Sequence, residues 1–283
     1  MRGDASPTAP RDGSAGPLPC RAVSGSVYVE REGPLGWLVF DHRERRNAVS
    51  LEMWQAIPAL AAALDADPEI RVVLLRGAGD EAFVSGADIS QFEAARTGAN
   101  AAQAYEETTG RAFAALSAIS KPVIAAIHGF CIGGGMAIAL TADLRIAADD
   151  ARLAIPAARL GLGYHASGVD ALVRLVGASV AKEIFFSARR FRADEALARG
   201  LVNEVVPKDS LEAHVRALAG GIAANAPLTL RSMKLVAREL SAPESQRDVA
   251  AIRASIAACF DSEDYREGVR AFLEKRSPKF QGR

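Results

Sequence analysis

Three consecutive glycines, Gly133 to Gly135, follow a short apolar run and precede a helical pattern. The run at 123–127 is typical of a buried strand, whereas each glycine inside a helix would cost about 1 kcal/mol relative to alanine. Glycines fit where the backbone must approach a ligand closely and present N–H groups at the start of a helix. Such a helix start attracts negative charge, including charge that exists only in a transition state. The stretch therefore predicts a backbone anion site.

A second candidate for chemistry is the loop 161–168, which carries Tyr164 and His165 side by side. A histidine titrates near neutral pH, and a tyrosine hydroxyl can donate a hydrogen bond or a proton. Packing of this loop near a subunit contact is the alternative interpretation of both residues. We interpret His128 and Asp143 as structural residues, because one lies at the end of a strand and the other behind the glycine helix.

Composition excludes several classes of partner. The chain has 283 residues with 34 basic and 34 acidic side chains, so its net charge of zero gives no support for nucleic-acid or anionic-membrane binding. Cys20, Cys131 and Cys259 lie far apart without metal-ligand spacing, which favours reduced intracellular thiols and no metal site. No apolar run approaches the ~20 residues of a membrane span. We expect a cytoplasmic protein.

The first 24 residues differ in composition from the rest. They are rich in Pro, Gly, Ala and Ser and lack the apolar region of a secretory signal. Their arginines suggest an organelle transit peptide, but Asp4, Asp12 and the prolines argue against an amphipathic helix. We interpret residues 1–24 as a disordered extension.

Alternating strands and helices must position the candidate residues. Strand, helix and strand in that order predict a right-handed crossover and a layered α/β core. Residues 83–90 are expected to form a glycine-bearing turn and residues 156–167 a loop. The predicted strands are 27–32, 36–41, 71–76, 123–127, 143–148, 152–155 and 201–206. The predicted helices are 51–66, 99–117, 134–141, two short helices flanking Gly177, and 193–199.

The pattern changes near residue 208. Beyond it no strand is predicted, and apolar residues recur at helical spacing. The expected helices are 211–224, 227–240, 247–260 and 263–276. The predicted organisation is therefore an extension (1–24), an α/β core (25–208) and a helical region (209–283).

Several motifs, weak singly but specific in this order and spacing, resemble the enoyl-CoA hydratase/isomerase family, the crotonases. They are Asn47-Ala48, Ser85 to Ile89, Lys121-Pro122 with Gly133 to Gly135, Ala142-Asp143, Leu160-Gly161, Ala196 to Val202 and Phe272 to Arg276. The resemblance implies a spiral of ββα units that binds acyl-CoA, followed by a helical region that packs homotrimers, usually paired into hexamers. It also implies coenzyme A as part of the substrate and no permanently bound cofactor.

The resemblance further implies an oxyanion hole, in which two backbone N–H groups hold the thioester oxygen as an enolate forms. By position these groups belong to Ala87 and Gly134. Preorganised donors suit an enolate oxygen, and loss of one typically costs about 10²–10³ in rate. Either glycine turn alone could be only a tight connection, but the two together favour the oxyanion hole. Asp88 is expected to cap the helix that follows it.

Contacts to the adenine and pantetheine of CoA are expected from two segments of one chain. These contacts are Arg46, Ala48, Ala87, Asp88, Ile89 and Ser90. Phe272 and Lys275 match positions that, in relatives, reach a CoA bound to a neighbouring subunit. Core packing is an equally good interpretation of Phe272, and a solvated helix face of Lys275.

The resemblance fails at the proton-transfer positions. A hydratase of this family uses two glutamates, one to activate water and one to handle the second proton. This chain has Ala137 and Ala157 at those positions. Because a positioned general acid or base contributes typically 10²–10⁴-fold, we expect efficient syn hydration to be absent.

Decarboxylation would avoid this loss, because it produces the enolate without an abstracting base. Tyr164 occupies a place where decarboxylating crotonases carry tyrosine, and residues 261–268 look similar to methylmalonyl-CoA decarboxylase. Tyr164 and His165 are therefore the candidates to replace the glutamates. Weak hydration, double-bond migration and decarboxylation of a malonyl-type thioester all stay open.

Two other classes compete with a family enzyme. Residues 161–166 match the dinucleotide fingerprint, with Glu183 about 20 residues further on, but Pro156 and Arg159 interrupt the preceding strand. A nicotinamide enzyme is therefore disfavoured. The other class is a CoA-ester binding protein without chemistry, which the missing glutamates would suit.

Overall fold

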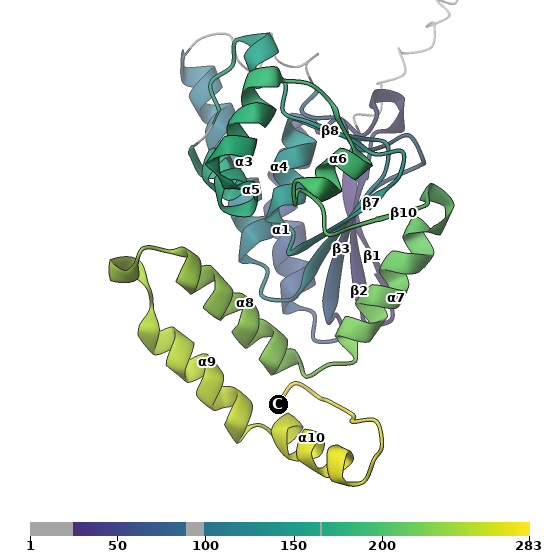
Figure 1. The fold of residues 1–283 in the computed structure, drawn as a ribbon, viewed down its shortest axis with the longest axis vertical. Coiled ribbons are helices and arrows are strands. Elements are labelled where there is room, and N and C mark those ends of the chain that lie inside the picture. The colour runs from purple at the N-terminus through teal and green to yellow at the C-terminus, as the bar shows by residue number, and fades with distance from the viewer. Residues whose placement is uncertain (1–24, 89–98, 165) are drawn as a thin grey trace, which may run out of the picture.

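The computed structural model describes residues 25–88, 99–164 and 166–283. A six-stranded sheet forms the centre of the core, antiparallel at one edge and parallel from its second strand onward (Figure 1). In spatial order its strands are β1 (Ser26–Glu32), β2 (Leu35–Asp41), β3 (Val72–Gly77), β5 (Val123–Ile127), β7 (Leu144–Ala148) and β10 (Glu204–Val206). Each of these strands falls inside or within one residue of a predicted one.

A second sheet consists of four short strands that alternate along the chain with strands of the first. Its strands, in order, are β4 (Ala82–Val84), β6 (Phe130–Ile132), β8 (Arg152–Ala154) and β9 (Phe191–Arg192). Strands β3, β5 and β7 of the large sheet are each followed by β4, β6 or β8 of the small sheet and then by a helix. The predicted spiral of ββα units is therefore confirmed. The expectation that 83–90 forms only a turn is wrong, because part of that segment is β4.

Helices cover one face of the large sheet and complete the spiral. They are α1 (Leu51–Ala66), α3 (Ala99–Ala118), α4 (Gly134–Thr141), α5 (Ala166–Ser187) and α6 (Ala193–Ala198), with short 3₁₀ turns η1 (Arg43–Arg45) and η3 (Ala157–Leu160). Gly177 has a positive φ of 78° within α5, so two helices meet there as predicted. The segment 156–167, predicted as a loop, contains η3 and the start of α5.

The sheet is buried on both faces, which explains its nearly continuous apolar strands. Along β2, Leu38 and Phe40 point to the side of the α1 and α3 helices, while Trp37 and Val39 belong to the opposite cluster. Helix α7 (Leu211–Ala223) covers this second cluster. The side chains of β3 alternate between the two clusters in the same way, so one strand contributes side chains to both packed layers.

Helix α1 is fixed at both ends by polar contacts. The Ser50 hydroxyl accepts the Met53 N–H at 3.3 Å and so caps the start of the helix. At the other end the buried Lys121 ammonium donates to the carbonyl oxygens of Leu64, at 2.8 Å, and Asp67. The Lys-Pro pair thereby ties the start of β5 to the helix packed over it, and burial lowers the pKa of Lys121.

Helices α8 (Pro227–Ser241), α9 (Val249–Asp261) and α10 (Glu263–Leu273) form an arm that stands apart from the core (Figure 1). The predicted boundary at residue 208 lies before α7, a helix that packs on the sheet, so the arm itself begins at α8. It carries several exposed apolar side chains, namely Met233, Leu240, Val249, Ile256, Phe260, Val269, Phe272 and Leu273. The Lys234 ammonium joins the arm to the core by contacting the Asp143 carboxylate at 2.7 Å.

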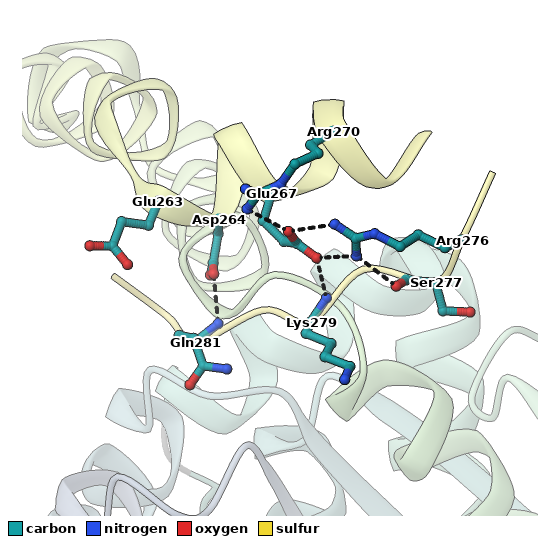
Figure 2. A pocket seen from close by; sticks show the side chains of 8 residues that line it. All are labelled: Glu263, Asp264, Glu267, Arg270, Arg276, Ser277, Lys279 and Gln281. Carbon is teal, nitrogen blue, oxygen red and sulfur yellow. Dashed lines mark hydrogen bonds and ion pairs between the residues drawn. The ribbon is translucent and has the colours of Figure 1, made fainter. Parts of the chain in front are cut away.

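The C-terminal tail folds back along α10 through a polar network (Figure 2). The Glu267 carboxylate accepts hydrogen bonds from the Arg276 guanidinium and from the Lys279 N–H. These contacts hold the pKa of Glu267 well below its usual range. The Asp264 carboxylate accepts the N–H groups of Gln281 and Gly282. The pocket between α10 and the tail is thus lined by charges that already pair with one another. No helix among the described residues is long and apolar enough to cross a bilayer.

Candidate functional site

The triple glycine places the start of α4 against strands of the small sheet. Gly133 has φ 54° and ψ −110°, a conformation that side-chain-bearing residues rarely adopt, and its N–H donates to the Ala154 carbonyl at 2.8 Å. A Cβ on Gly135 would overlap the carbonyl oxygen of Val84 in β4. The glycines therefore allow α4 to begin directly against β4 and β8.

Ala87 reaches the same place from the other glycine turn. It forms a parallel bridge with Val49, in which the Val49 N–H donates to Gly86 at 2.8 Å and the Asp88 N–H donates to Val49 at 3.0 Å. In a parallel pair the residue between two such bonds points its own N–H to the opposite side. The Ala87 N–H consequently faces away from Val49.

The two predicted N–H groups lie side by side. A Cβ built on Gly134 would lie 3.5 Å from the Ala87 nitrogen. Gly134 is the first residue of α4, where backbone N–H groups have no partner inside the helix. Within the described residues neither the Ala87 nor the Gly134 N–H donates a hydrogen bond. Two such donors from adjacent glycine turns can hold a single oxygen that gains negative charge.

Aromatic residues form one wall beside this pair. The Trp54 Cζ2 atom lies 3.3 Å from the position of a Cβ on Gly134. The Trp54 indole, on α1, packs edge-on against Phe113 of α3, with ring centroids 5.2 Å apart. Trp54 is 1% exposed, and its Nε1 has no hydrogen-bond partner in the part of the chain that the structure describes. Sequence reasoning did not select Trp54, because a tryptophan on an amphipathic helix is usually a core residue.

Both proton-transfer positions are occupied by methyl groups near the glycine turn. Ala137 lies one turn into α4 and is half-buried, and its N–H donates to the Gly133 carbonyl at 3.0 Å. Ala157 is buried at the start of η3 and accepts the Leu162 N–H at 3.1 Å. Neither residue can transfer a proton through its side chain.

Tyr164 is packed into the core next to the small sheet. Its ring meets Phe185 of α5 edge-on at 5.0 Å between centroids, and Gly168 leaves room for it, because a Cβ there would lie 2.7 Å from Cε1. Burial raises the pKa of Tyr164 to about 12, with a smaller contribution from the thiol of Cys131 in β6. The phenol therefore stays neutral and acts as a donor. His165 lies outside the described residues.

The predicted CoA contacts are only partly described. Arg46 adopts a left-handed conformation with φ 53°, and its guanidinium stacks on Phe130 at 4.8 Å. Ala48 is buried, and its carbonyl lies 2.9 Å from His42 Nδ1. The buried Asp88 carboxylate lies 3.3 Å from the Arg45 guanidinium. Ile89 and Ser90, and any helix that Asp88 would cap, lie outside the described residues.

Phe272 and Lys275 lie far from Ala87 and Gly134 within one chain. Phe272 is 83% exposed near the end of α10, and Lys275 follows the helix with a positive φ of 54°. Figure 1 shows α10 at the far end of the arm from α4. A core-packing role for Phe272 does not fit this exposure in the single chain.

Comparison with known proteins gives the family. The family model described as enoyl-CoA hydratase/isomerase matches residues 30–283. This chain belongs to the enoyl-CoA hydratase/isomerase family. A crotonyl-CoA hydratase of Syntrophomonas wolfei is 34% identical over 255 residues, which are 90% of this chain and 97% of the relative. A carnitinyl-CoA dehydratase of Salmonella typhi is 34% identical over 269 residues, covering 92% of this chain and 100% of the relative.

A solved structure agrees with this assignment to the enoyl-CoA hydratase/isomerase family. The enoyl-CoA hydratase/carnithine racemase of Magnetospirillum magneticum superposes with a TM-score of 0.87 at 36% identity. The match covers 91% of this chain and 96% of that structure. The family and the fold predicted from the motifs are thus confirmed, and a CoA thioester as substrate fits this family.

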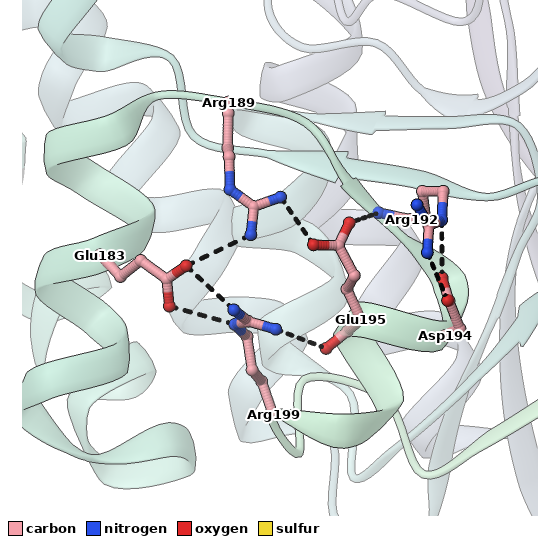
Figure 3. A network of polar contacts seen from close by, with 6 residues as sticks. All are labelled: Glu183, Arg189, Arg192, Asp194, Glu195 and Arg199. Carbon is pink, nitrogen blue, oxygen red and sulfur yellow. Dashed lines mark hydrogen bonds and ion pairs between the residues drawn. The ribbon is translucent and has the colours of Figure 1, made fainter.

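In the structure, the acidic residue that the nicotinamide hypothesis requires is already paired with arginines. The Glu183 carboxylate pairs with the guanidinium groups of Arg189, at 3.2 Å, and Arg199, at 3.0 Å (Figure 3). These contacts join α5 to the end of α6 and hold the pKa of Glu183 below its usual range. Residue Gly161 follows a 3₁₀ turn rather than a strand. Among the described residues no cluster of side chains could hold a metal ion.

Proposed function

We propose that this chain stabilises the enolate of an acyl-CoA thioester with the N–H groups of Ala87 and Gly134. The observation that carries the proposal is the closeness of these two N–H groups, neither of which donates a hydrogen bond within the described residues. Backbone donors fixed by packed strands need no reorganisation as charge develops on the oxygen. Enolate stabilisation is therefore the chemistry that this backbone supports best.

The same geometry argues against the two-glutamate route to hydration. Ala137 and Ala157 offer neither a base to activate water nor an acid to protonate the enolate carbon. A reaction that needs both groups would lose the 10²–10⁴-fold that each typically contributes. We infer that any hydration of an enoyl-CoA by this chain is slow.

Decarboxylation of a malonyl-type thioester is the candidate reaction favoured by Tyr164. The bond between C2 and the carboxylate breaks, its electron pair forms the enolate, and CO₂ leaves. A proton from the Tyr164 hydroxyl then adds to C2 and is replaced from solvent. A phenol with a pKa of about 12 remains protonated at neutral pH, as this donor role requires.

A homotrimer, or a hexamer made of two trimers, would complete the proposed site. The exposed apolar side chains of α8, α9 and α10 would be covered by neighbouring chains. In such an assembly Phe272 and Lys275 would reach the CoA of an adjacent subunit. Arg46, Ala48, Asp88, Ile89 and Ser90 would contact the CoA bound to their own chain.

One assay panel tests the proposed reaction. Purified full-length protein is given crotonyl-CoA, a 3-enoyl-CoA and methylmalonyl-CoA, and hydration, isomerisation and CO₂ release are measured in parallel. We expect CO₂ release to be the fastest. Robust crotonyl-CoA hydration would overturn the inference drawn from Ala137 and Ala157. Binding of all three esters without turnover would favour a CoA-ester binding protein, and no binding would refute the oxyanion assignment.

A further inference from the structure

Trp54 carries a buried hydrogen-bond donor without a partner. Its Nε1 is fully buried and unpaired in the described part of the chain, whereas Nε1 of Trp37 donates to the Glu32 carboxylate at 3.2 Å. Buried polar groups are nearly always paired in native proteins, so an exception requires an explanation such as a bound ligand. The explanation must account for a donor deep beside α4.

The edge of the indole that carries Nε1 faces the glycine turn. Cζ2, which lies 3.3 Å from the position of a Cβ on Gly134, and Nε1 are both bonded to Cε2. Their hydrogens therefore point to the same side of the ring. Edge-on packing against Phe113, at 70° between the ring planes, fixes the ring in this orientation. The edge of the ring that includes Cζ2 and Nε1 is thus held beside Gly134.

The groups proposed for this site are mainly hydrogen-bond donors. Ala87 and Gly134 offer backbone N–H groups, Tyr164 is a neutral phenol, and the two alanines at the proton-transfer positions are apolar. The thioester oxygen occupies the two backbone donors. Because the Trp54 ring edge lies beside Gly134, a second acceptor oxygen on the acyl group, close to the thioester carbonyl, would satisfy its N–H.

We propose that the Trp54 Nε1–H binds a carboxylate on C2 of the acyl group and so selects malonyl-type thioesters. The proposal rests on the proposed oxyanion hole at Ala87 and Gly134. A hydrogen bond to a charged acceptor is stronger than a neutral one, which favours a carboxylate over a hydroxyl group. A neutral donor orients the carboxylate without cancelling its charge, and the apolar surroundings of that charge favour its loss as CO₂.

Indole NMR tests this contact directly, because the chain has two tryptophans. Full-length protein with ¹⁵N-labelled indoles is titrated with 2-sulfopropionyl-CoA, whose sulfonate supplies acceptors at C2 but cannot leave as CO₂. Isobutyryl-CoA, with a methyl group in that place, is the matched ligand. We expect the Trp54 N–H signal to move downfield with the sulfonate ester only. The Trp37 signal, already hydrogen-bonded to Glu32, should stay in place with both ligands.

A substitution that removes only the N–H measures what the contact contributes. Site-specific replacement of Trp54 by 3-benzothienylalanine keeps the bicyclic shape and replaces the N–H by sulfur. The sulfonate ester should bind about 10- to 100-fold more weakly to this variant, and isobutyryl-CoA should bind as before.

The outcomes separate this inference from the proposed function. If both esters bind and shift the Trp54 signal equally, the carboxylate contact is refuted while acyl-CoA binding stands. The contact is likewise refuted if a 3-hydroxyacyl-CoA shifts the signal and the sulfonate ester does not. If neither ester binds the wild-type protein, the proposed function itself fails. The titration uses the wild-type chain, so the test holds even if the variant does not fold.

Discussion

The candidate site has a backbone half and a side-chain half, and the two depend on different parts of the fold. The backbone half consists of the N–H groups of Ala87 and Gly134, which the Val49 bridge and the contact between Gly135 and Val84 hold in place. The side-chain half consists of Ala137, Ala157 and the loop of Tyr164. Core packing holds the backbone half in place, whereas the side-chain half consists of residues that lie beside it.

This difference explains how one family can hold several activities. Moving a backbone donor requires repacking of strands, whereas a side chain beside it can change without altering the fold. Relatives named as a hydratase and a dehydratase each match at least 90% of this chain. In this chain we propose that the enolate-binding backbone is retained, whereas alanines stand at the two positions where hydratases carry glutamate.

Restoring the side-chain half should produce the largest effect. We expect the double variant Ala137→Glu, Ala157→Glu to gain hydration of crotonyl-CoA by about 10²–10⁴-fold, because each site would regain a positioned carboxylate. The rate of hydration is followed by loss of the enoyl absorbance. The matched control is Ala137→Gln, Ala157→Gln, which adds the same bulk without a base. Equal rates for the two folded variants would show that more than the glutamates is missing.

Removing one backbone donor should have the next largest effect. Gly134 is the first residue of α4, where the backbone N–H has no partner inside the helix, so Gly134→Pro deletes the N–H without removing a hydrogen bond of the helix. We expect kcat for the native reaction to fall by about 10²–10³.

Gly134→Ala is the control for that variant, because it keeps the N–H. Its methyl group would meet Trp54 Cζ2 at 3.3 Å, a contact that a small ring movement relieves, so its loss should be much smaller. Thermal unfolding of both variants checks that the fold is retained. Equal kcat values for the two folded variants would remove Gly134 from the oxyanion hole.

A third prediction removes a group from the side-chain half, the hydroxyl of Tyr164. Tyr164→Phe keeps the ring that packs on Phe185 and removes the hydroxyl, so stability should change little while CO₂ release falls about 10²-fold. The raised pKa of about 12 keeps the wild-type phenol protonated, so this group should cause no loss of rate between about pH 8 and pH 10. An unchanged rate in Tyr164→Phe would leave protonation of C2 to solvent or to another residue.

Sequence predicted the long elements of this fold better than the short ones. Helical periodicity located α1 and α7, and the continuous apolar run located β5, because each spans enough residues to show its pattern. Strands β4, β6 and β9 have only two or three residues, too few for a period-two pattern to reveal them. The closing of these strands into a second sheet came from the family resemblance rather than from periodicity.

The site was predictable where the glycines required it and not elsewhere. Three adjacent glycines have few structural uses, and the structure places the Ala87 nitrogen beside Gly134 as the motifs implied. No sequence pattern indicated that Trp54 belongs to the site, because the absence of a partner for its buried N–H depends on how α1, α3 and α4 pack together. Such a contact belongs to tertiary structure, and no local spacing encodes it.

The smallest predicted effect is a pH dependence of stability, and its cause lies between the two strands that lead to the glycine turn. His128 lies between β5 and β6, is 8% exposed, and has no partner for Nε2 among the described residues. Burial lowers its pKa, Asp150 and Asp80 oppose this effect, and Lys208 and Arg76 add to it. The folded protein therefore holds His128 neutral at pH values where the unfolded chain binds a proton.

The sign of the resulting pH dependence follows from that lowered pKa. Stability is full above about pH 6.5, the pKa in the unfolded chain, and is lost as the pH falls below it, by at most about 1.4 kcal/mol per pH unit. Denaturant unfolding from about pH 7.5 to pH 5 should show this slope, and His128→Gln should reduce it. A slope that survives in His128→Gln would assign the acid sensitivity to other groups and leave the backbone half of the site independent of pH.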